Sequence, residues 1–431
     1  MMVIPRDLYL DRLIQRKHNG LVKVITGIRR CGKSYLLNRL FYEHLLASGV
    51  APSHIIRFAF DSADDLGMIG EDILDLETEK RGADPKKFLS YINDKISDGG
   101  QYYLLLDEIQ MLDCFVPVLN GFLRKDNLDI YVTGSNARLL SKDIATEFAG
   151  RGDEVHIWPL SYAEFYSVCG SNRQEAFAEY MMYGGIPLVA LRQTDEEKVA
   201  TLHNLFSEIY LRDIQRRSNI EKVGELEDLL NILASGIGSL TNPQKLQNTF
   251  RSVKKSNIST ETIVEYLNLL EDSFLIDSAH RYDIKGRAYV NAPLKYYFSD
   301  LGLRNARINF RQVEPTHSME NIIYNELRMR GYNVDVGVVP VGKPKDSAEI
   351  HLELEVDFVC NLGDKRYYIQ SAFSLPDAAK REQEIRPLRN IDDSFKKIVV
   401  TNDVVKPYYD DFGIQTLNIC DFLLDPGYMG K

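Results

Sequence analysis

The sequence has few cysteines, no long hydrophobic run and no excess of positive charge. Its five cysteines lie far apart and include no Cys-x-x-Cys pair, which excludes an encoded zinc site or disulfide framework and fits a reducing cytoplasm. No stretch approaches the length of a membrane span, and the N-terminal segment MMVIPRDLYLDRL carries charges where a signal peptide needs an apolar run. We therefore expect a cytoplasmic protein with no membrane contact.

The net charge of the chain is −10, from 52 basic and 62 acidic residues, so the chain as a whole is not attracted to nucleic acid or anionic membranes. Any DNA contact must come from a local basic patch. Hydrophobic residues make up 44% and charged residues 26%, which is ordinary for a globular protein, and we find no internal repeat or low-complexity segment. At 431 residues the chain is too long for one core, and we expect about three domains.

Residues 22–37, VKVITGIRRCGKSYLL, contain a phosphate-binding loop in its required context, between a β-branched strand and an apolar-periodic helix. Glycines let backbone N–H groups turn toward the phosphates, Lys33 reaches the β- and γ-phosphates, and Ser34 offers a hydroxyl to Mg²⁺. An ordinary glycine turn is the alternative. The motif predicts ATP and Mg²⁺ as cofactors, with nucleotide contacts from Gly27, Arg30, Cys31, Gly32, Lys33, Ser34 and Tyr35.

A pair of carboxylates completes the predicted site. The apolar run YYLLL at residues 102–106 is followed at once by Asp107 and Glu108. Asp107 would hold the Mg²⁺ shell together with Ser34, and Glu108 would polarise the attacking water. Alone, these residues would favour a solvated acidic turn. Because ligands in open α/β sheets gather at the carboxyl ends of strands, the presence of Lys33 upstream favours the catalytic interpretation.

Further polar positions extend this site. A fourth strand ends in Gly-Ser-Asn, so Ser135 or Asn136 would sense the γ-phosphate or position water, with a satisfied turn as the alternative. Arg151, in an exposed glycine turn, would act in trans on the nucleotide of a neighbouring subunit. Arg138 is the second candidate for that role, and a surface salt bridge is the alternative for either arginine. The predicted catalytic residues are Lys33, Glu108, Asn136 and Arg151.

These motifs resemble those of the AAA+ superclass of P-loop ATPases. More closely, they resemble bacterial and archaeal ATPases in which an AAA domain precedes a C-terminal domain of unknown function. The segments that carry the resemblance are GIRRCGKS, YYLLLDEIQ, YVTGSNARLLS, the GR before HIWPLSYAEF, YGGIPLV and LEVDF.

The resemblance implies an α/β fold in residues 1–158, with a parallel five-stranded sheet whose phosphate-loop strand is central. It also implies assembly into a ring and a helical lid over residues 159–218. In this lid Pro187, within Gly-Gly-Ile-Pro, would contact the adenine, with helix punctuation as the alternative. Arg212 and Asp213 would form an interdomain salt bridge or sense nucleotide, and the salt bridge is favoured.

Residues 219–305 show the order helix, turn, helix and β-hairpin that is typical of a winged helix. The helix that would enter a groove, TETIVEYLNLLED, has no Lys or Arg and is poorly suited to a surface lined by phosphates. Phosphate contacts to duplex DNA would come instead from Lys254, Lys255, Arg281, Lys285 and Arg287. Packing or assembly is the alternative role of this module.

Residues 306–431 alternate helices and strands in an order that resembles the PD-(D/E)xK nuclease fold. Such enzymes hold Mg²⁺ with acidic residues and place a lysine two positions after the second acid or glutamine. Ala372 stands at that position, and Lys380 on the following helix is a distant substitute. We therefore expect a nuclease-like domain that does not cut, although three residues match its scheme: Glu320, Asp357 and Gln370.

The leading functional hypothesis is a Mg²⁺-dependent, ATP-hydrolysing molecular switch or motor that self-assembles and acts on DNA. One alternative is an ATP-regulated, metal-dependent DNA nuclease. A second alternative is a signalling or adaptor ATPase that uses nucleotide to change shape and has no activity on DNA.

Overall fold

The computed structural model describes most of the chain, namely residues 3–79, 81–134, 150–207, 214, 222–311, 313–341 and 352–430. The chain divides into two compact units, Met1–Trp158 and Pro159–Lys431. We call them the N-terminal unit and the C-terminal unit.

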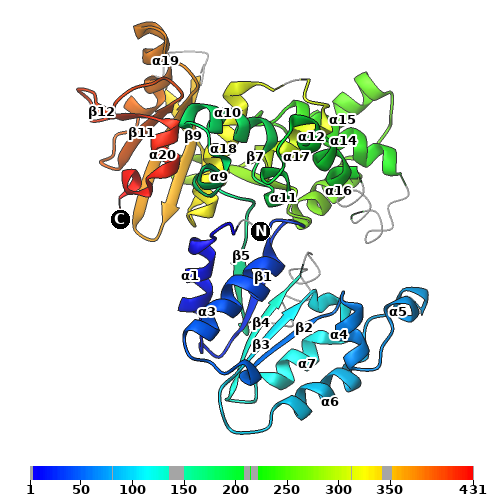
Figure 1. The fold of residues 1–431 in the computed structure, drawn as a ribbon. Helices are drawn as coiled ribbons and strands as arrows, with labels where there is room; N and C mark the ends of the chain where they lie inside the picture. The colour runs from blue at the N-terminus through cyan, green and yellow to red at the C-terminus, as the bar shows by residue number, and fades with distance from the viewer. Residues whose placement is uncertain are drawn as a thin grey trace. The chain divides into compact units, whose positions relative to one another are not determined.

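The N-terminal unit is built on a five-stranded parallel sheet (Figure 1). In chain order the strands are β1 (Val22–Thr26), β2 (Ile55–Ala59), β3 (Tyr102–Asp107), β4 (Leu128–Thr133) and β5 (Gly152–His156). The predicted parallel sheet is confirmed, but the expectation that the phosphate-loop strand is central is wrong. The spatial order is β2-β3-β4-β1-β5, which makes β4 the middle strand. The phosphate-loop strand β1 is the fourth, with β4 on one side and the edge strand β5 on the other.

Helices cover both faces of this sheet, which explains why β1 and β3 are buried along their whole length. Figure 1 shows α1 (Asp7–Gln15) and α3 (Tyr42–Ala47) on one side and α4 (Ala63–Met68), α6 (Pro85–Lys95) and α7 (Phe115–Phe122) on the other. The shorter α5 (Ile73–Glu79) lies between α4 and α6 in the chain. Apolar side chains of the strands and of α4 to α7 form one continuous core.

The chain that follows the phosphate loop is helical from Lys33 to Ala47. It begins as α2 (Lys33–Tyr35), continues through a π-helical stretch at Leu36–Phe41 and ends as α3. Its buried face consists of Leu36, Leu37, Phe41 and Leu45. This apolar periodicity fixes the helix on the sheet and so sets where the preceding loop lies.

The C-terminal unit begins with helices and continues as a mixed eight-stranded sheet. The helices before the sheet are α9 (Tyr162–Cys169), α10 (Arg173–Tyr183), α11 (Pro187–Ala190), α12 (Asp195–Asn204), α14 (Val223–Ser235), α15 (Pro243–Thr249) and α16 (Thr260–Asp272). The later helices are α17 (Leu301–Arg307), α18 (Pro315–Met329), α19 (Ala378–Arg389) and α20 (Ile419–Leu424).

The strand order of the larger sheet is β12-β13-β11-β10-β9-β8-β6-β7. In chain order the strands are β6 (Ile276–Asp283), β7 (Ala288–Phe298), β8 (Asn333–Val341), β9 (Leu352–Leu362), β10 (Lys365–Ala372), β11 (Lys396–Thr401), β12 (Tyr408–Tyr409) and β13 (Gln415–Asn418). The α19 helix packs on β9, β10 and β11 and closes an apolar core over that part of the sheet.

The predicted hairpin of the winged helix is present as β6 and β7, but these strands do not form a separate small sheet. Residues 281–283 of β6 pair in parallel with residues 336–338 of β8, so the hairpin is continuous with the strands predicted for the next domain. The helices α14, α15 and α16 precede it in the predicted order. The winged helix itself stays a prediction.

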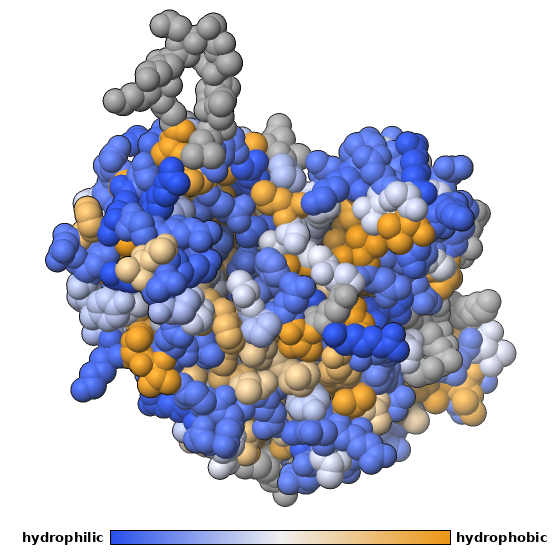
Figure 2. Space-filling view, turned by 90° about the horizontal axis from the view of Figure 1, so that it is seen from above, coloured by the Kyte–Doolittle hydropathy of each residue, from blue (hydrophilic) through white to orange (hydrophobic). Residues whose placement is uncertain are grey.

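One face of the molecule carries mostly hydrophilic residues (Figure 2). On this face hydrophobic residues lie in separate patches, as Figure 2 shows. Within the part of the chain that the structure describes, no helix combines the length and the apolar character that crossing a membrane requires.

Candidate functional site

The phosphate-binding loop connects the end of β1 to the start of α2, and two of its positions need glycine. Gly27 has a φ of 138°, and a Cβ atom there would lie 2.1 Å from the carbonyl oxygen of Ile157. Gly32 has a φ of 105°. Side chains at both positions would be strained, so the glycines of the motif are required by the backbone path. Arg30, between them, is also left-handed, with a φ of 67°.

Lys33 is folded into the loop. Its side chain is buried, and its Nζ atom donates hydrogen bonds to the carbonyl oxygens of Gly27 at 2.9 Å and Ile28 at 3.1 Å. Both acceptors are neutral. A phosphate oxygen would be a stronger partner, because its negative charge adds Coulomb attraction to the hydrogen bond from the ammonium. The lysine is therefore placed to exchange two backbone partners for an anionic ligand.

An arginine outside the motif supports the loop. Arg6 is buried and donates to the carbonyl oxygens of Cys31 at 3.0 Å and Trp158 at 2.6 Å. Cys31 is itself fully buried, so its carbonyl group points into the protein. Sequence reasoning missed Arg6, because nothing in its local sequence marks a partner 25 residues away.

Tyr35, at the end of the predicted nucleotide-binding segment, differs from its neighbours. Among the residues described, its buried hydroxyl has no hydrogen-bond partner.

Ser34 and Asp107 are neighbours. The Ser34 hydroxyl lies close enough to the Asp107 carboxyl to lower its pKa, and Asn38 donates to Asp107 Oδ2 at 3.0 Å. Thr133, at the end of β4, donates its hydroxyl to Asp107 Oδ1. Because β1, β3 and β4 are adjacent parallel strands, the loop, the carboxylate and the threonine meet at one edge of the sheet.

Glu108 follows Asp107 in a left-handed conformation, with a φ of 52°. Its backbone N–H donates to the Thr133 hydroxyl at 3.1 Å, and the Gln110 side chain donates to its Oε2 atom. The Thr133 hydroxyl therefore bridges the two predicted acidic residues, as an acceptor for one and a donor for the other. Sequence reasoning placed this polar role two or three positions later and missed Thr133.

The negative charge of this edge is concentrated. Burial raises the pKa of Asp107 above its ordinary value, and the charges of Glu108 and Asp61 add to the effect, whereas hydrogen bonds from Thr133 and Ser34 oppose it. Burial also raises the pKa of Asp61, with a further contribution from Glu108 and an opposing one from Arg29. Carboxylates whose pKa values are raised by burial and by one another gain from a bound cation, because it offsets both effects.

The residues present fit ATP with Mg²⁺. The Ser34 hydroxyl and the Asp107 carboxylate are neighbours, which is the arrangement that a shared Mg²⁺ ion requires. The described chain contains no group of three or more His, Cys, Asp or Glu side chains arranged to hold a metal. The protein would thus supply two ligands here, and phosphate oxygens and water would supply the others, as is usual for Mg²⁺ with nucleotides.

Several positions that the sequence singled out lie outside the described residues, namely the predicted catalytic Asn136 and the candidates Ser135, Arg138, Arg212 and Asp213. Arg151 is described. It is exposed, donates to Asn120 Oδ1 at 3.1 Å, and accepts a backbone hydrogen bond from Val22 at 2.9 Å. Val22 begins β1, whereas the phosphate loop follows its other end. Arg151 is therefore remote from the loop of its own chain, and its action in trans stays a prediction.

Pro187 is the first residue of α11, in the C-terminal unit. The preceding glycines are held by neighbours in that unit: the Gly185 carbonyl accepts from Leu160 N at 2.7 Å, and its N–H donates to Asp300 Oδ2 at 2.7 Å. A Cβ atom on Gly184 would lie 2.3 Å from Asp300 Oδ1. Close packing against Asp300 thus accounts for the glycines, and the adenine contact of Pro187 stays a prediction.

Three of the basic residues predicted for DNA contact lie in different local settings. Lys254 Nζ is 2.6 Å from Asp228 Oδ1, and Arg281 forms a 2.7 Å ion pair with Glu353 while its side chain is only 13% exposed. Lys255 is exposed and has a left-handed φ of 52°. Two of these three cations therefore have an acidic partner already.

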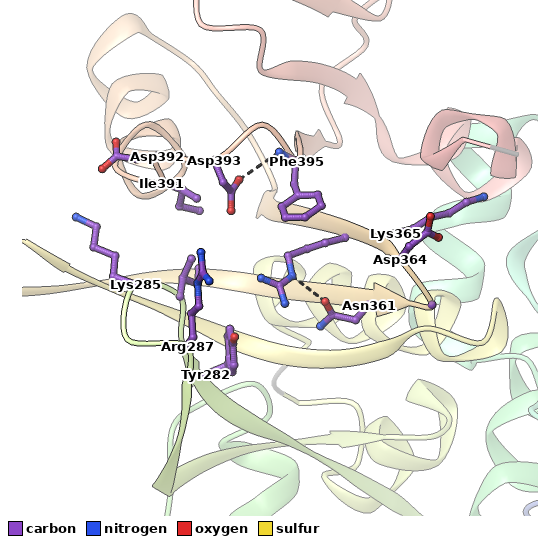
Figure 3. Close-up of a pocket in the computed structure, with 13 residues that line it drawn as sticks. Tyr282, Lys285, Arg287, Asn361, Asp364, Lys365, Ile391, Asp392, Asp393 and Phe395 are labelled. Carbon is purple, nitrogen blue, oxygen red and sulfur yellow. Dashed lines mark hydrogen bonds between the residues drawn. The ribbon is translucent and has the colours of Figure 1, made fainter.

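The other two, Lys285 and Arg287, lie in the turn between β6 and β7 and line a cavity of about 540 Å³ (Figure 3). Lys365 and Arg366 of β10 line the same cavity, but so do three acidic residues: Asp364, Asp392 and Asp393. The four cations are thus nearly balanced by carboxylates. Phosphate binding at this cavity remains a prediction.

The three nuclease-like residues come together in the C-terminal unit. Asp357 N donates to Gln370 Oε1 at 3.4 Å, and Glu320 and Asp357 both face Lys295 of β7. Lys380 instead forms a 2.5 Å ion pair with Glu384 on its own helix, α19. Sequence reasoning missed Lys295, which comes from a strand far from the carboxylates in the sequence.

Comparisons with known proteins agree with this division of the chain. The family model described as "AAA domain" matches residues 19–166, and the model described as "Domain of unknown function (DUF8612)" matches residues 174–314. The first match contains the phosphate loop, Asp107, Glu108 and Thr133. The chain therefore contains an AAA domain. Neither family model extends past residue 314, and the nuclease-like fold of residues 306–431 stays a prediction.

Two relatives align with nearly the whole chain. A Haemophilus influenzae protein named "Uncharacterized protein" is 35% identical over 429 residues, which cover 98% of this chain and 99% of that protein. "Uncharacterized protein MJ1544" of Methanocaldococcus jannaschii is 27% identical over 438 residues, covering 97% and 88%. A solved structure, the Walker-type ATPase paby2304 of Pyrococcus abyssi, is 18% identical with a TM-score of 0.49, covering 71% of this chain and 96% of that one.

Proposed function

The chain belongs to the same family as the Haemophilus influenzae protein and contains an AAA domain, and from this premise we propose that it is a Mg²⁺-dependent, ATP-hydrolysing molecular switch or motor. One observation carries the proposal: Asp107 and Glu108 are both hydrogen-bonded to the Thr133 hydroxyl at one edge of the sheet, beside Ser34 and the phosphate loop. A structural loop would not need a buried acid and a partly buried one connected in this way.

In the proposed reaction each residue has a distinct task. Lys33 exchanges its two carbonyl partners for oxygens of the β- and γ-phosphates and neutralises their charge. Glu108 orients the attacking water and accepts its proton, while Thr133 holds the Glu108 backbone in place. Mg²⁺, held by Ser34 and Asp107, would screen the phosphate charge when bound. Among the loop residues, Gly27, Arg30, Cys31 and Gly32 shape the backbone that receives the phosphates.

Self-assembly and action on DNA complete the proposal. They are supported by the resemblance to AAA+ ATPases, in which an arginine of one subunit serves the nucleotide of the next. Arg151 is exposed and is the described candidate for that role. DNA contact would be made by phosphate-binding cations of the C-terminal unit, of which Lys255, Lys285 and Arg287 have the most exposed settings.

The direct test replaces Glu108 by glutamine and measures ATP binding and phosphate release separately. Glu108→Gln should bind ATP normally, because Lys33, Ser34 and Asp107 are unchanged, and should lose at least about 100-fold in turnover. Lys33→Ala should lose binding as well. Glu265→Gln, the same change at an exposed position of α16, is the matched control and should leave both unchanged. Full turnover by Glu108→Gln would contradict the assignment of the base.

A second measurement separates the leading proposal from its alternatives. The protein is incubated with Mg²⁺, ATP and either duplex or single-stranded DNA. Turnover that DNA stimulates without cutting supports a DNA-acting switch or motor. Cutting that Asp357→Ala abolishes would support an ATP-regulated nuclease, and turnover indifferent to DNA would support a signalling or adaptor ATPase.

A further inference from the structure

The C-terminal unit contains a buried lysine among three carboxylates. Lys295, on β7, is only 4% exposed. Its Nζ atom lies 2.8 Å from Glu320 Oε1, 2.7 Å from Glu355 Oε1 and 3.9 Å from Asp357 Oδ1. We call these four residues the Lys295 cluster. A buried ammonium with this many anionic neighbours is uncommon, because charges are almost never fully buried unless they are paired.

Neighbouring groups saturate the carboxylates of the Lys295 cluster. The Tyr297 hydroxyl donates to Glu320 Oε1 at 2.7 Å, and His317 Nδ1 lies 3.6 Å from Glu320 Oε2. On the other side, Ser371 N donates to Asp357 Oδ2 at 2.8 Å. Each buried carboxylate thus has a donor in addition to Lys295. Most of the buried charge in the cluster is therefore paired, and pairing is the condition under which buried charges are tolerated.

Strand pairing and hydrogen bonds from α18 position Lys295. Lys295 pairs with Ala279 of β6, just before a register shift between Ala279 and Arg281 that separates this half of the hairpin from the half paired with β8. Asn321 of α18 then fixes the end of β7, because its side chain exchanges two 2.8 Å hydrogen bonds with the backbone of Phe298. The neighbouring residue on α18 is Glu320, so this clamp sets Lys295 opposite it.

Charge pairing within the Lys295 cluster keeps the ammonium ionised. Burial opposes the charge on Lys295, but Glu320, Asp357 and Glu355 more than compensate and raise its pKa, so the ammonium stays charged. Burial would raise the pKa of Glu320, but Lys295, His317 and Tyr297 lower it to about 2. For Asp357, burial and the charge of Glu320 raise the pKa, whereas Lys295 and the Ser371 backbone hydrogen bond oppose that rise.

Oxygen ligands of this kind are those that Mg²⁺ and Mn²⁺ prefer. Yet in the described residues the carboxylates are not arranged as a metal-binding group, and the ammonium lies between them instead. We propose that the Lys295 ammonium is a built-in cation that occupies the place of a divalent metal between Glu320, Glu355 and Asp357. The C-terminal unit then takes up no metal at this position and cannot carry out metal-dependent cleavage there.

This inference goes beyond the proposed ATPase and does not depend on it. It also explains why no lysine is needed at position 372. The positive charge comes from Lys295 on β7, which replaces the metal ion and does not act beside it. A catalytic lysine would stand beside a bound metal and would leave the carboxylates free to ligate it. Here Lys295 itself contacts two of them at hydrogen-bond distance.

The test measures Mn²⁺ binding to the full chain without nucleotide, by electron paramagnetic resonance of the free ion. We expect the wild type to have no Mn²⁺ site at the Lys295 cluster. Asp357→Asn should therefore leave Mn²⁺ binding by the otherwise wild-type protein unchanged. Lys295→Ala should gain one site per chain, with affinity at least tenfold above wild type, because removing the ammonium leaves uncompensated carboxylates. Adding Asp357→Asn to Lys295→Ala should remove that site again. Lys406→Ala, an exposed lysine of the same unit, is the control and should gain nothing.

Two outcomes would overturn the inference. The first is Mn²⁺ binding by the wild type that Asp357→Asn abolishes, which would make Lys295 a companion of a real metal. The second is a folded Lys295→Ala protein that gains no Mn²⁺ site. If Lys295→Ala does not fold, the wild-type measurement alone decides. Neither result depends on ATP turnover, so failure here and failure of the ATPase proposal are distinguishable.

Discussion

Thr133 offers a sharp test of how the ATPase site is held together. It is fully buried, and its single hydroxyl donates to Asp107 Oδ1 while accepting the backbone N–H of Glu108. Thr133→Val replaces this hydroxyl by a methyl group of similar size, so it removes two hydrogen bonds without opening a cavity. The change therefore isolates the polar contribution of one atom to stability and to turnover.

The size of the effect follows from the two partners. A hydrogen bond to a charged group contributes about 1.5–3 kcal/mol and a neutral one about 0.5–1.5 kcal/mol, so Thr133→Val should lower the free energy of unfolding by about 2–4 kcal/mol. Glu108 loses its backbone anchor, and a displacement of about 1 Å in a catalytic group costs about 100-fold in rate. We expect turnover to fall by about that factor, while ATP affinity stays near wild type because Lys33 and its loop are untouched.

The assay combines urea unfolding of the N-terminal unit with steady-state phosphate release over a range of ATP concentrations. Thr133→Ser keeps the hydroxyl and is the matched control, which should retain most of the activity. Wild-type turnover in Thr133→Val would refute the anchoring argument. Equal losses in the serine and valine variants would also refute it, since the methyl group and not the hydroxyl would then be responsible.

Two further predictions address assembly and pH. An arginine acting in trans is typically worth 10³-fold or more, so Arg151→Ala should be nearly inactive alone, yet mixing it with Lys33→Ala subunits should restore activity through hybrid interfaces. Verified mixed assemblies without any rescue would exclude a shared site. Burial raises the pKa of Asp300 from 3.8 to about 6 against the hydrogen bonds it accepts, so the folded state binds this proton more tightly than the unfolded state. The stability of the wild type relative to Asp300→Asn should thus be greatest below pH 4 and fall by about 3 kcal/mol as the pH rises through 6, measured by urea unfolding across pH. A difference that is the same at all pH values would contradict the buried charge.

Features encoded by neighbouring residues were predicted well. The phosphate loop and its flanking strand and helix are local, and the structure places Gly27 and Gly32 in conformations that need glycine. The buried strand that ends at Asp107 was also correctly located, because a continuous apolar run of this length has few other uses in an α/β protein.

Features that depend on how strands are ordered were predicted poorly. The polar residue beside Glu108 is Thr133, and recognising it requires knowing that β4 lies directly between β3 and β1. The same information corrects the expected central position of β1. Lys295 was missed for a similar reason, since its partners Glu355 and Asp357 come from a strand that neither pairs with β7 nor lies near it in the sequence.

The pairing of β6 with β8 in one sheet has a consequence for which segments of this protein can be exchanged in evolution. The ammonium of the Lys295 cluster lies before residue 305 and its three carboxylates lie after it, so a break at that point separates a buried cation from all of its counter-ions. Either fragment would carry unpaired charge at its centre and would be poorly soluble as an independent domain. Gene rearrangements that shuffle modules at this position would be eliminated, and the stretch from β6 to β13 is expected to be gained, lost or exchanged as one block.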